Sequence, residues 1–179
     1  KIAPGVNTIR MTVFIPRDTK EGFHEIEFSA KAKVGEKEIL KKIAVSDDIM
    51  QAFLYRHLIP TEKLFLFVSN QSWLPFRDFP KELSMKAGEE KKLTWPCPGF
   101  KPKEDVNYLL ELDSPPAGIS ISDGKFEGEN YSITIRADAD MKAWTGNLIF
   151  CCFSDKKGQK KNASRYLVGY LPALPTKVQ

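Results

Sequence analysis

The feature that most constrains this chain is a period-two alternation of apolar and polar residues over much of its length. Ile9–Ile15 is one such run, and Ile26–Val34 is a second. Successive side chains of a strand point to opposite faces, so this period is typical of half-buried β-strands. Gly35 and Glu36 then predict a hairpin turn before a strand over Glu38–Val45.

One segment has helical rather than strand periodicity. Ser46 or Asp47 can cap a helix, and apolar residues at helical spacing continue as far as His57, before Pro60. We therefore predict one short helix over about 46–58, at one end of a β-rich unit.

The rest of the chain contains short apolar runs separated by Gly and Pro turns. Leu64–Val68 is wholly apolar, which predicts a strand buried on both faces. Gln71–Lys81 is rich in Pro and aromatic residues, and we interpret it as a stiff elbow between two units. The runs after it are spaced as in an all-β sandwich. These further predicted strands are Glu82–Met85, Lys91–Trp95, Asn107–Leu112, Gly118–Ile121, Tyr131–Arg136, Leu148–Phe153 and Arg165–Tyr170.

An internal half-repeat suggests that the chain contains two related units. A shift that places Gly22 on Gly146 also brings Ile9 onto Ile133. Both copies then have an alternating strand, a polar connection, a glycine and a second alternating strand. Repeated units of this kind are typical of modular arrays.

Two segments in the second half resemble a known family. Tyr131–Asp138 and Trp144–Phe150 look like the late strands of bacterial immunoglobulin-like domains, and Leu83–Leu93 is similar to their first strand and turn. Such modules occur in tandem in large secreted or surface proteins. The resemblance covers Glu82–Val178, and Ile9–Val45 in part. It implies an extracytoplasmic setting, either periplasmic, cell-surface or secreted, and a spacer, adhesive or accessory role, and it transfers no functional residues.

We therefore predict an all-β protein of tandem immunoglobulin-like β-sandwich units. The N-terminal unit is expected over 1–80, with its short helix, and the C-terminal sandwich over 81–179. Because the chain starts at Lys1 without a methionine, we also expect it to be a piece of a longer protein.

The composition argues against catalysis and cofactors. The 179 residues include two histidines, His24 and His57, and no Gly-x-Ser-x-Gly or phosphate-binding glycine motif. Glu111 and Asp113 share a strand face and are the best carboxylate pair for a hydrolase, although acids on a solvated strand face are routine. We predict that the chain is not an enzyme and that it binds no cofactor.

Metal binding is an equally weak alternative. Asp138 and Asp140, with Asp123, could offer oxygen ligands to Ca²⁺ in a loop, but their spacing lacks the pattern of a helical calcium loop. We interpret them as solvated loop residues and predict no metal site.

Three cysteines leave the redox state open. Adjacent strand residues face opposite ways, so only Cys151 or Cys152 can face the core with Cys97. A bridge from Cys97 to either is one reading. Pro96 and Pro98 make a poor strand context, and we interpret the cysteines as small buried residues.

The charge pattern excludes two classes of partner. The 27 Lys and Arg are interleaved along the chain with the 23 Asp and Glu, whereas proteins that bind nucleic acids gather basic residues on one face. The longest uncharged run, Leu64–Phe76, is too short and too polar to span a membrane.

The aromatics have the most binding potential. Trp73, Phe76 and Phe79 cluster in the elbow, and Trp95 and Trp144 lie in or beside loops of the second unit. Exposed rings of this kind bind proteins or stack on sugars. The alternative is that the elbow rings pack between two units and fix their angle. We predict a non-catalytic structural or interaction module that holds neighbouring domains or binds another protein, with a carbohydrate-binding accessory module as the alternative.

Overall fold

The chain is all-β in a computed structural model that describes residues 7–16, 18–51, 54–69, 74–122, 124–156 and 165–179. Every regular element within these ranges is a strand. The chain divides into two compact units. We call Lys1–Phe14 with Ser72–Gln179 the sandwich unit, and Ile15–Gln71 the hairpin unit.

This division differs from the predicted one at residue 80. The elbow residues Phe76 and Phe79 group with the sandwich unit, as do the first fourteen residues of the chain. Phe76 is buried in the core of that unit and Phe79 packs against it, so the described part of the predicted elbow, residues 74–81, belongs to the sandwich unit.

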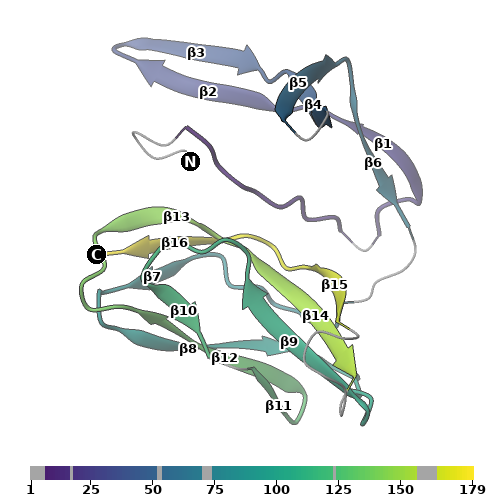
Figure 1. The fold of residues 1–179 in the computed structure, drawn as a ribbon, viewed down its shortest axis with the longest axis vertical. Coiled ribbons are helices and arrows are strands. Elements are labelled where there is room, and N and C mark those ends of the chain that lie inside the picture. Colours follow the sequence, from purple (N-terminus) through teal and green to yellow (C-terminus); the bar gives the residue numbers. More distant parts are fainter. Residues whose placement is uncertain (1–6, 17, 52–53, 70–73, 123, 157–164) are drawn as a thin grey trace. The chain divides into compact units, whose positions relative to one another are not determined.

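One layer of the sandwich unit is built around a central strand (Figure 1). β12 pairs antiparallel with three strands, because its eight residues are long enough to accept one strand on one side and two short ones on the other. The layer contains β8 (Glu90–Pro96), β10 (Ile119–Ile121), β11 (Lys125–Glu127) and β12 (Asn130–Ala137).

The second layer is made of two three-stranded sheets that join end to end. Ile149 interrupts one long strand into β13 and β14, and residues 171–173 interrupt its neighbour into β15 and β16. The amide of Leu171 donates to Phe150 O at 2.9 Å across this break. The orders are β13–β16–β7 and β15–β14–β9, with β7 parallel to β16. Their bounds are β7 (Leu83–Met85), β9 (Val106–Leu112), β13 (Trp144–Leu148), β14 (Phe150–Lys156), β15 (Tyr166–Tyr170) and β16 (Leu174–Val178).

Aromatic rings fill the space between the two layers. Trp95 of β8 meets Phe150 of β14 edge-on, with ring centroids 5.5 Å apart. Phe76 meets Tyr131 of β12 in the same way at 5.6 Å. All four side chains are almost fully buried. The strands alternate because each sends every second side chain into this core.

The buried hydroxyl of Tyr131 ties the two layers together. It donates to Tyr108 O at 3.0 Å and accepts the amide of Leu110 at 3.3 Å, both on β9. Gly124 makes room for the ring, because a β-carbon there would lie 2.1 Å from the hydroxyl oxygen. A buried phenol needs such partners, since an unpaired hydroxyl in a core is costly.

Replacing Tyr131 with Phe should therefore destabilise the sandwich unit. The change leaves a backbone carbonyl and amide of β9 without this partner, and we expect a loss of about 1–3 kcal/mol in the free energy of unfolding, measured by urea titration. Tyr166→Phe is the matched control, because Tyr166 is 70% exposed and should change stability by less than about 0.5 kcal/mol. Equal effects of the two substitutions would contradict this role of the hydroxyl.

The predicted strand over Ile9–Ile15 is wrong. The residues form no strand, and the half-buried positions are Ile9, Thr12 and Ile15. A period of three fits an extended chain without a ladder partner, whereas period two needs a neighbouring strand. The half-repeat with Ile133 therefore fails at its first strand, because Ile133 lies in β12.

Side-chain contacts hold residues 7–14, which we call the strap, against the second layer of the sandwich unit. Arg10 forms an ion pair with Asp113. Asn147 Nδ2 donates to Arg10 O at 3.1 Å, and the amide of Ala173 donates to Thr12 Oγ1 at 2.6 Å. Most residues of the strap are exposed, so it should detach before the sandwich unfolds.

Acid should loosen the strap. The Arg10 guanidinium holds the pKa of the Asp113 carboxyl below its usual range. Stabilisation from a lowered pKa is present above the ordinary carboxyl pKa and is lost as pH falls through the lowered one. Both side chains are partly exposed, so the effect should not exceed about 1 kcal/mol. Amide exchange of the strap should rise relative to that of β12 in this range, and Asp113→Asn should give the faster exchange already at neutral pH. A pH-independent ratio would contradict the ion pair's contribution.

The hairpin unit contains three antiparallel strand pairs, each a separate two-stranded sheet. The predicted turn at Gly35 and Glu36 is confirmed, between β2 and β3. The pairs are β1 (Gly22–Ile26) with β6 (Leu64–Val68), β2 (Ser29–Val34) with β3 (Lys37–Lys42), and β4 (Val45–Gln51) with β5 (Tyr55–Thr61).

The predicted helix over 46–58 is wrong, because its described residues lie in the β4–β5 hairpin. Ile49 lies opposite His57 in this hairpin, so two residues at helical spacing become cross-strand neighbours on one face. Short apolar runs do not distinguish the two structures. Pro60, expected to end the helix, pairs opposite Ser46 in a two-stranded sheet, where a missing amide can face the open edge.

Candidate functional site

The most unusual surface of the chain is an aromatic sheet face in the hairpin unit. Phe23 lies opposite Phe67, and Phe65 is the next outward residue on the same strand as Phe67. The three rings share one face and are 76%, 54% and 53% exposed, in the order Phe23, Phe67, Phe65. The rings of Phe23 and Phe67 are 4.9 Å apart and tilted by 54°. We call this surface the phenylalanine face.

The predicted burial of Leu64–Val68 on both faces is therefore wrong. The other face of β6 carries Leu64, Leu66 and Val68, and of these Val68 is buried and the two leucines are half-buried. Leu64 and Ile26 also border a cavity of about 280 Å³ inside the unit. The strand thus has one partly covered and one open apolar face.

The two hairpins of the unit, β2–β3 and β4–β5, are open as well. Val68 is the one buried side chain among the described residues of the hairpin unit. In β4–β5, Met50 and Leu58 are exposed on one face, and Tyr55 and Ile59 on the other. The exposed large apolar residues of the unit are Phe23, Val34, Ile39, Leu40, Ile43, Ile49, Met50, Leu54, Tyr55, Leu58, Ile59, Phe65 and Phe67.

Charge in the hairpin unit is balanced. Lys63 pairs with Glu25 at 2.8 Å beside the phenylalanine face, and Lys31 pairs with Glu38 at 2.7 Å. Basic and acidic residues are equal in number over residues 15–71. The basic ones are Arg17, Lys20, Lys31, Lys33, Lys37, Lys41, Lys42, Arg56 and Lys63, and the acidic ones are Asp18, Glu21, Glu25, Glu27, Glu36, Glu38, Asp47, Asp48 and Glu62.

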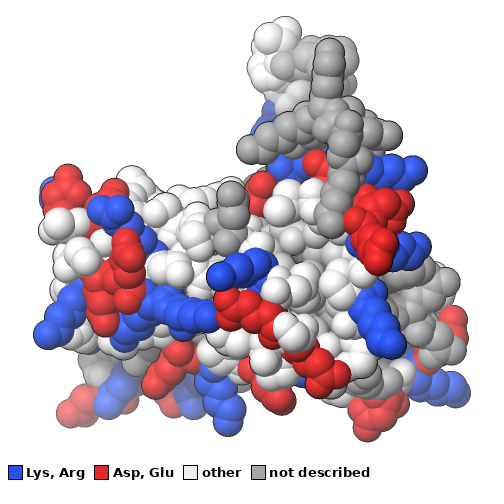
Figure 2. Space-filling view, turned by 90° about the horizontal axis from the view of Figure 1, so that it is seen from below, with Lys and Arg blue, Asp and Glu red and all other residues white. Residues whose placement is uncertain are grey.

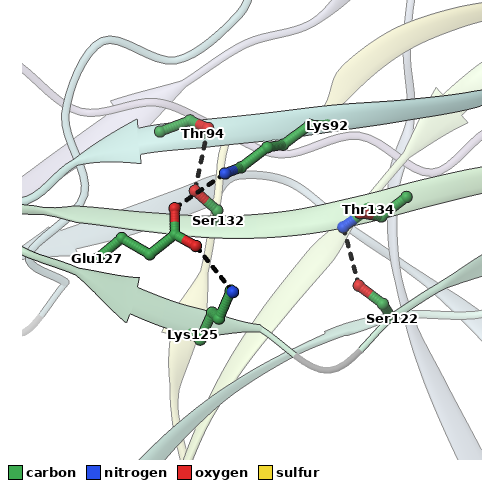
Figure 3. A network of polar contacts seen from close by, with 7 residues as sticks. All are labelled: Lys92, Thr94, Ser122, Lys125, Glu127, Ser132 and Thr134. Atoms are coloured by element: carbon green, nitrogen blue, oxygen red, sulfur yellow. Dashed lines mark hydrogen bonds and ion pairs between the residues drawn. The ribbon is translucent and has the colours of Figure 1, made fainter.

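The outer face of the β8–β12–β11 layer is polar instead (Figure 3). The Glu127 carboxylate accepts from Lys92 Nζ at 2.8 Å and lies 2.9 Å from Lys125 Nζ, and these bonds lower its pKa to about 2. Thr94 and Ser132 exchange a hydroxyl bond at 3.1 Å beside them. This face satisfies its own polar groups and offers little apolar area to a partner.

The charge distribution agrees with this. Figure 2 shows Lys and Arg interleaved with Asp and Glu on the face that it draws, among the residues that are described. An interleaved surface lacks the single-sign field that steers polyanions.

Two of the predicted contact aromatics are buried. Phe76 and Trp95 are each 1% exposed, so the prediction that they contact a partner or glycan is wrong. Trp73 lies outside the described residues. Phe79 is half-buried, with its ring 6.4 Å from that of Phe14. The polar residues and prolines around these rings are typical of loops. Phe76 and Trp95 nevertheless lie in the core of the sandwich unit, and Phe79 packs against it.

Trp144 is different, because it borders a hollow at one end of the sandwich unit. The hollow has a volume of about 560 Å³ and is also lined by Asp138, Asp140 and Lys142. The indole lies over Gly146, where a β-carbon would come within 2.4 Å of the ring. A flat, supported indole beside carboxylates can stack on a sugar ring and accept its hydroxyls.

A calcium site in this hollow has less support. Asp138 and Asp140 both line it, and Asp123 lies outside the described residues. Across the part of the chain that is described, no group of three or more His, Cys, Asp or Glu side chains could hold a metal ion.

The candidate carboxylate pair is occupied by arginines. Glu111 pairs with Arg165, whose guanidinium also stands 3.6 Å over the ring of Phe153, and Asp113 pairs with Arg10. Each carboxylate thus serves an ion pair.

The cysteines are free and buried. Cys97 and Cys152 belong to the core, as expected for one of the two adjacent residues, and Cys151 does not. Burial raises the pKa of the Cys97 and Cys151 thiols, and that of Cys152 to about 12. Protonated thiols of this kind are poor nucleophiles and metal ligands.

The two histidines lie on strands. His57 is in β5, within the segment predicted as a helix, and His24 is in β1. A ring nitrogen of His24 lies 2.7 Å from Lys20 O.

Comparison with protein-family models, with curated proteins and with solved structures finds no match for this chain. In the described portion, no helix is long and apolar enough to cross a membrane.

The sequence did not predict the phenylalanine face because both faces of Leu64–Val68 are apolar. In Leu64–Val68, leucine and phenylalanine alternate, and a hydrophobicity pattern treats the two alike. The one sequence sign that separates them is Glu25, a charged residue that lies opposite Phe65 and marks that face as open to water.

Proposed function

We propose that this chain is a non-catalytic interaction module of a larger extracytoplasmic bacterial protein. In this proposal the sandwich unit is a stable immunoglobulin-like support, and the hairpin unit binds a protein partner. The observation that carries it is the phenylalanine face, Phe23, Phe65 and Phe67, on a unit with one buried side chain among its described residues.

The energetics of the hairpin unit support binding. A two-stranded sheet is at best marginally stable in water, and three such sheets with open faces share little core. The exposed large apolar residues of the unit present on the order of 1,500 Å², at about 200 Å² for a full side chain. These residues lie on several faces, and the phenylalanine face alone, at about 350–400 Å², matches the largest apolar patch of a typical monomer, which is about 300–600 Å² and often functional. A partner that covers these faces would supply the missing stabilisation.

The strand pairing of the sandwich unit supports the immunoglobulin-like part of the proposal. An immunoglobulin sandwich has one sheet of its second, fourth and fifth strands and another of its third, sixth and seventh. Here β8, β10 and β12 share one layer, and β9, β14 and β15 share the other. The described strands of the hairpin unit show no such pairing, so the support concerns one unit of the predicted tandem.

Photo-crosslinking from the phenylalanine face tests the interaction role. We expect a benzophenone side chain in place of Phe67 to form protein adducts in the native host, because an interface excludes water around this position. Tyr166, on the edge strand β15 of the sandwich unit and equally aromatic and exposed, is the control position and should form far fewer. The absence of adducts from positions 23, 65 and 67 alike would reject the proposed function.

Carbohydrate binding is the second candidate, favoured by the hollow at Trp144. If this candidate is correct, the chain should bind to an array of immobilised glycans. Trp144→Ala should then weaken binding by about tenfold through lost stacking. Trp144→Phe keeps an aromatic platform and should retain most of the affinity. Wild-type chain that binds no glycan, or binding that survives Trp144→Ala, would remove this candidate.

A further inference from the structure

We propose that the partner of the hairpin unit is a second copy of this chain, and that the phenylalanine face lies at the centre of a twofold dimer interface. This inference rests on the proposed function and names the occupant of its binding surface. Three properties of the hairpin unit favour a copy of itself: the area available, the balance of charge and the shape of the exposed sheet.

The area fits what a stable dimer needs. A standard interface buries about 800 Å² on each partner. Phe23, Phe65 and Phe67 together present about 350–400 Å², so they cover about half of that requirement. The β4–β5 hairpin of the same unit exposes Met50 and Leu58 on one face and Tyr55 and Ile59 on the other, and one of these faces would supply the remainder. One small ligand or one peptide would leave most of this apolar area in water.

The charge balance permits a surface to meet itself. In a twofold interface the same patch occurs on both sides, so a patch with excess charge of one sign repels its own copy. The hairpin unit has equal numbers of basic and acidic residues over 15–71. The excess of four positive charges in the whole chain therefore belongs to the remaining residues. A neutral apolar surface of this kind associates with a copy of itself without an electrostatic penalty.

The same balance argues against a membrane surface as the occupant. Proteins that insert an apolar face into a bilayer surface surround it with Lys and Arg that attract anionic lipids. Beside the phenylalanine face, Lys63 is paired with Glu25 at 2.8 Å. The local charge thus offers nothing to an anionic headgroup.

The geometry suits packing of sheet on sheet. Two sheets pack about 10 Å apart through side chains on their facing surfaces. Phe23, Phe65 and Phe67 all project from one side of β1–β6, and the opposite side is already partly covered. Two hairpin units that meet through these rings would form a two-layered core, which one hairpin unit does not form from its described residues. Large aromatic side chains at the centre of an interface carry most of its binding energy.

Sedimentation equilibrium of the intact chain tests the proposal. Wild-type chain should sediment with the mass of two chains, and Phe65→Ser should weaken the dimer by about 30-fold or more, as for a central interface residue. Tyr166→Ser removes an exposed aromatic from the sandwich unit and should leave the dimer unchanged. A wild-type chain that is monomeric, or a dimer that tolerates Phe65→Ser as well as it tolerates Tyr166→Ser, would overturn the proposal.

Hydrogen exchange on wild-type chain covers the case in which Phe65→Ser unfolds the hairpin unit. Dilution below the dissociation constant should accelerate exchange in β1 and β6 and leave β12 unchanged. Exchange in β1 and β6 that does not depend on concentration would count against the dimer.

The crosslinking experiment separates the two proposals. Adducts from position 67 to peptides of the same chain support both. Adducts to a different protein, with a monomeric chain in sedimentation, support the interaction role and reject the second copy. A monomer that forms no adducts rejects both.

Discussion

The contact on which the rest of the structure depends is the aromatic packing between the two layers of the sandwich unit. Trp95, Phe150, Phe76 and Tyr131 meet edge to face in a dry interior, and the Tyr131 hydroxyl bonds one layer to the backbone of the other. The two halves of the chain thus differ in what they can bury. Because the buried core lies in the sandwich unit, the hairpin unit needs another surface to cover its exposed apolar side chains.

The sequence predicts the sandwich unit better than the hairpin unit. In β8 and β12, apolar residues that enter the core alternate with polar residues such as Lys92 and Thr134 on the other face. In β4–β5 both faces are open, so no face imposes a period, and the residues read as a helix. The predicted strand over Ile9–Ile15 was wrong for the opposite reason. Its apolar and polar residues alternate, but among the described residues no strand pairs with it. Whether a segment follows the period of a strand or of a helix depends on which of its faces the rest of the fold buries, and the segment's own residues do not record this.

The candidate sites were predicted unevenly for a related physical reason. Trp144 was expected as a contact residue and does border a hollow. Trp95 was also expected as a contact residue, because the prolines and glycine that follow it are typical of a loop. Its ring lies in the core instead. Phe23 and Phe67 are far apart in the sequence, and strand pairing brings their rings to 4.9 Å. A site assembled by long-range pairing leaves almost no local signal.

Residues on both sides of the hairpin unit in the sequence belong to the same sandwich unit. The hairpin unit is therefore an insertion, and while the strap is bound both of its ends are joined to the sandwich unit. The ends also remain joined to one body when the hairpins open, so the chain entropy gained on opening is smaller than for a terminal arm of equal length. An insertion of this kind can stay ready for a partner with less internal stability than an arm would need.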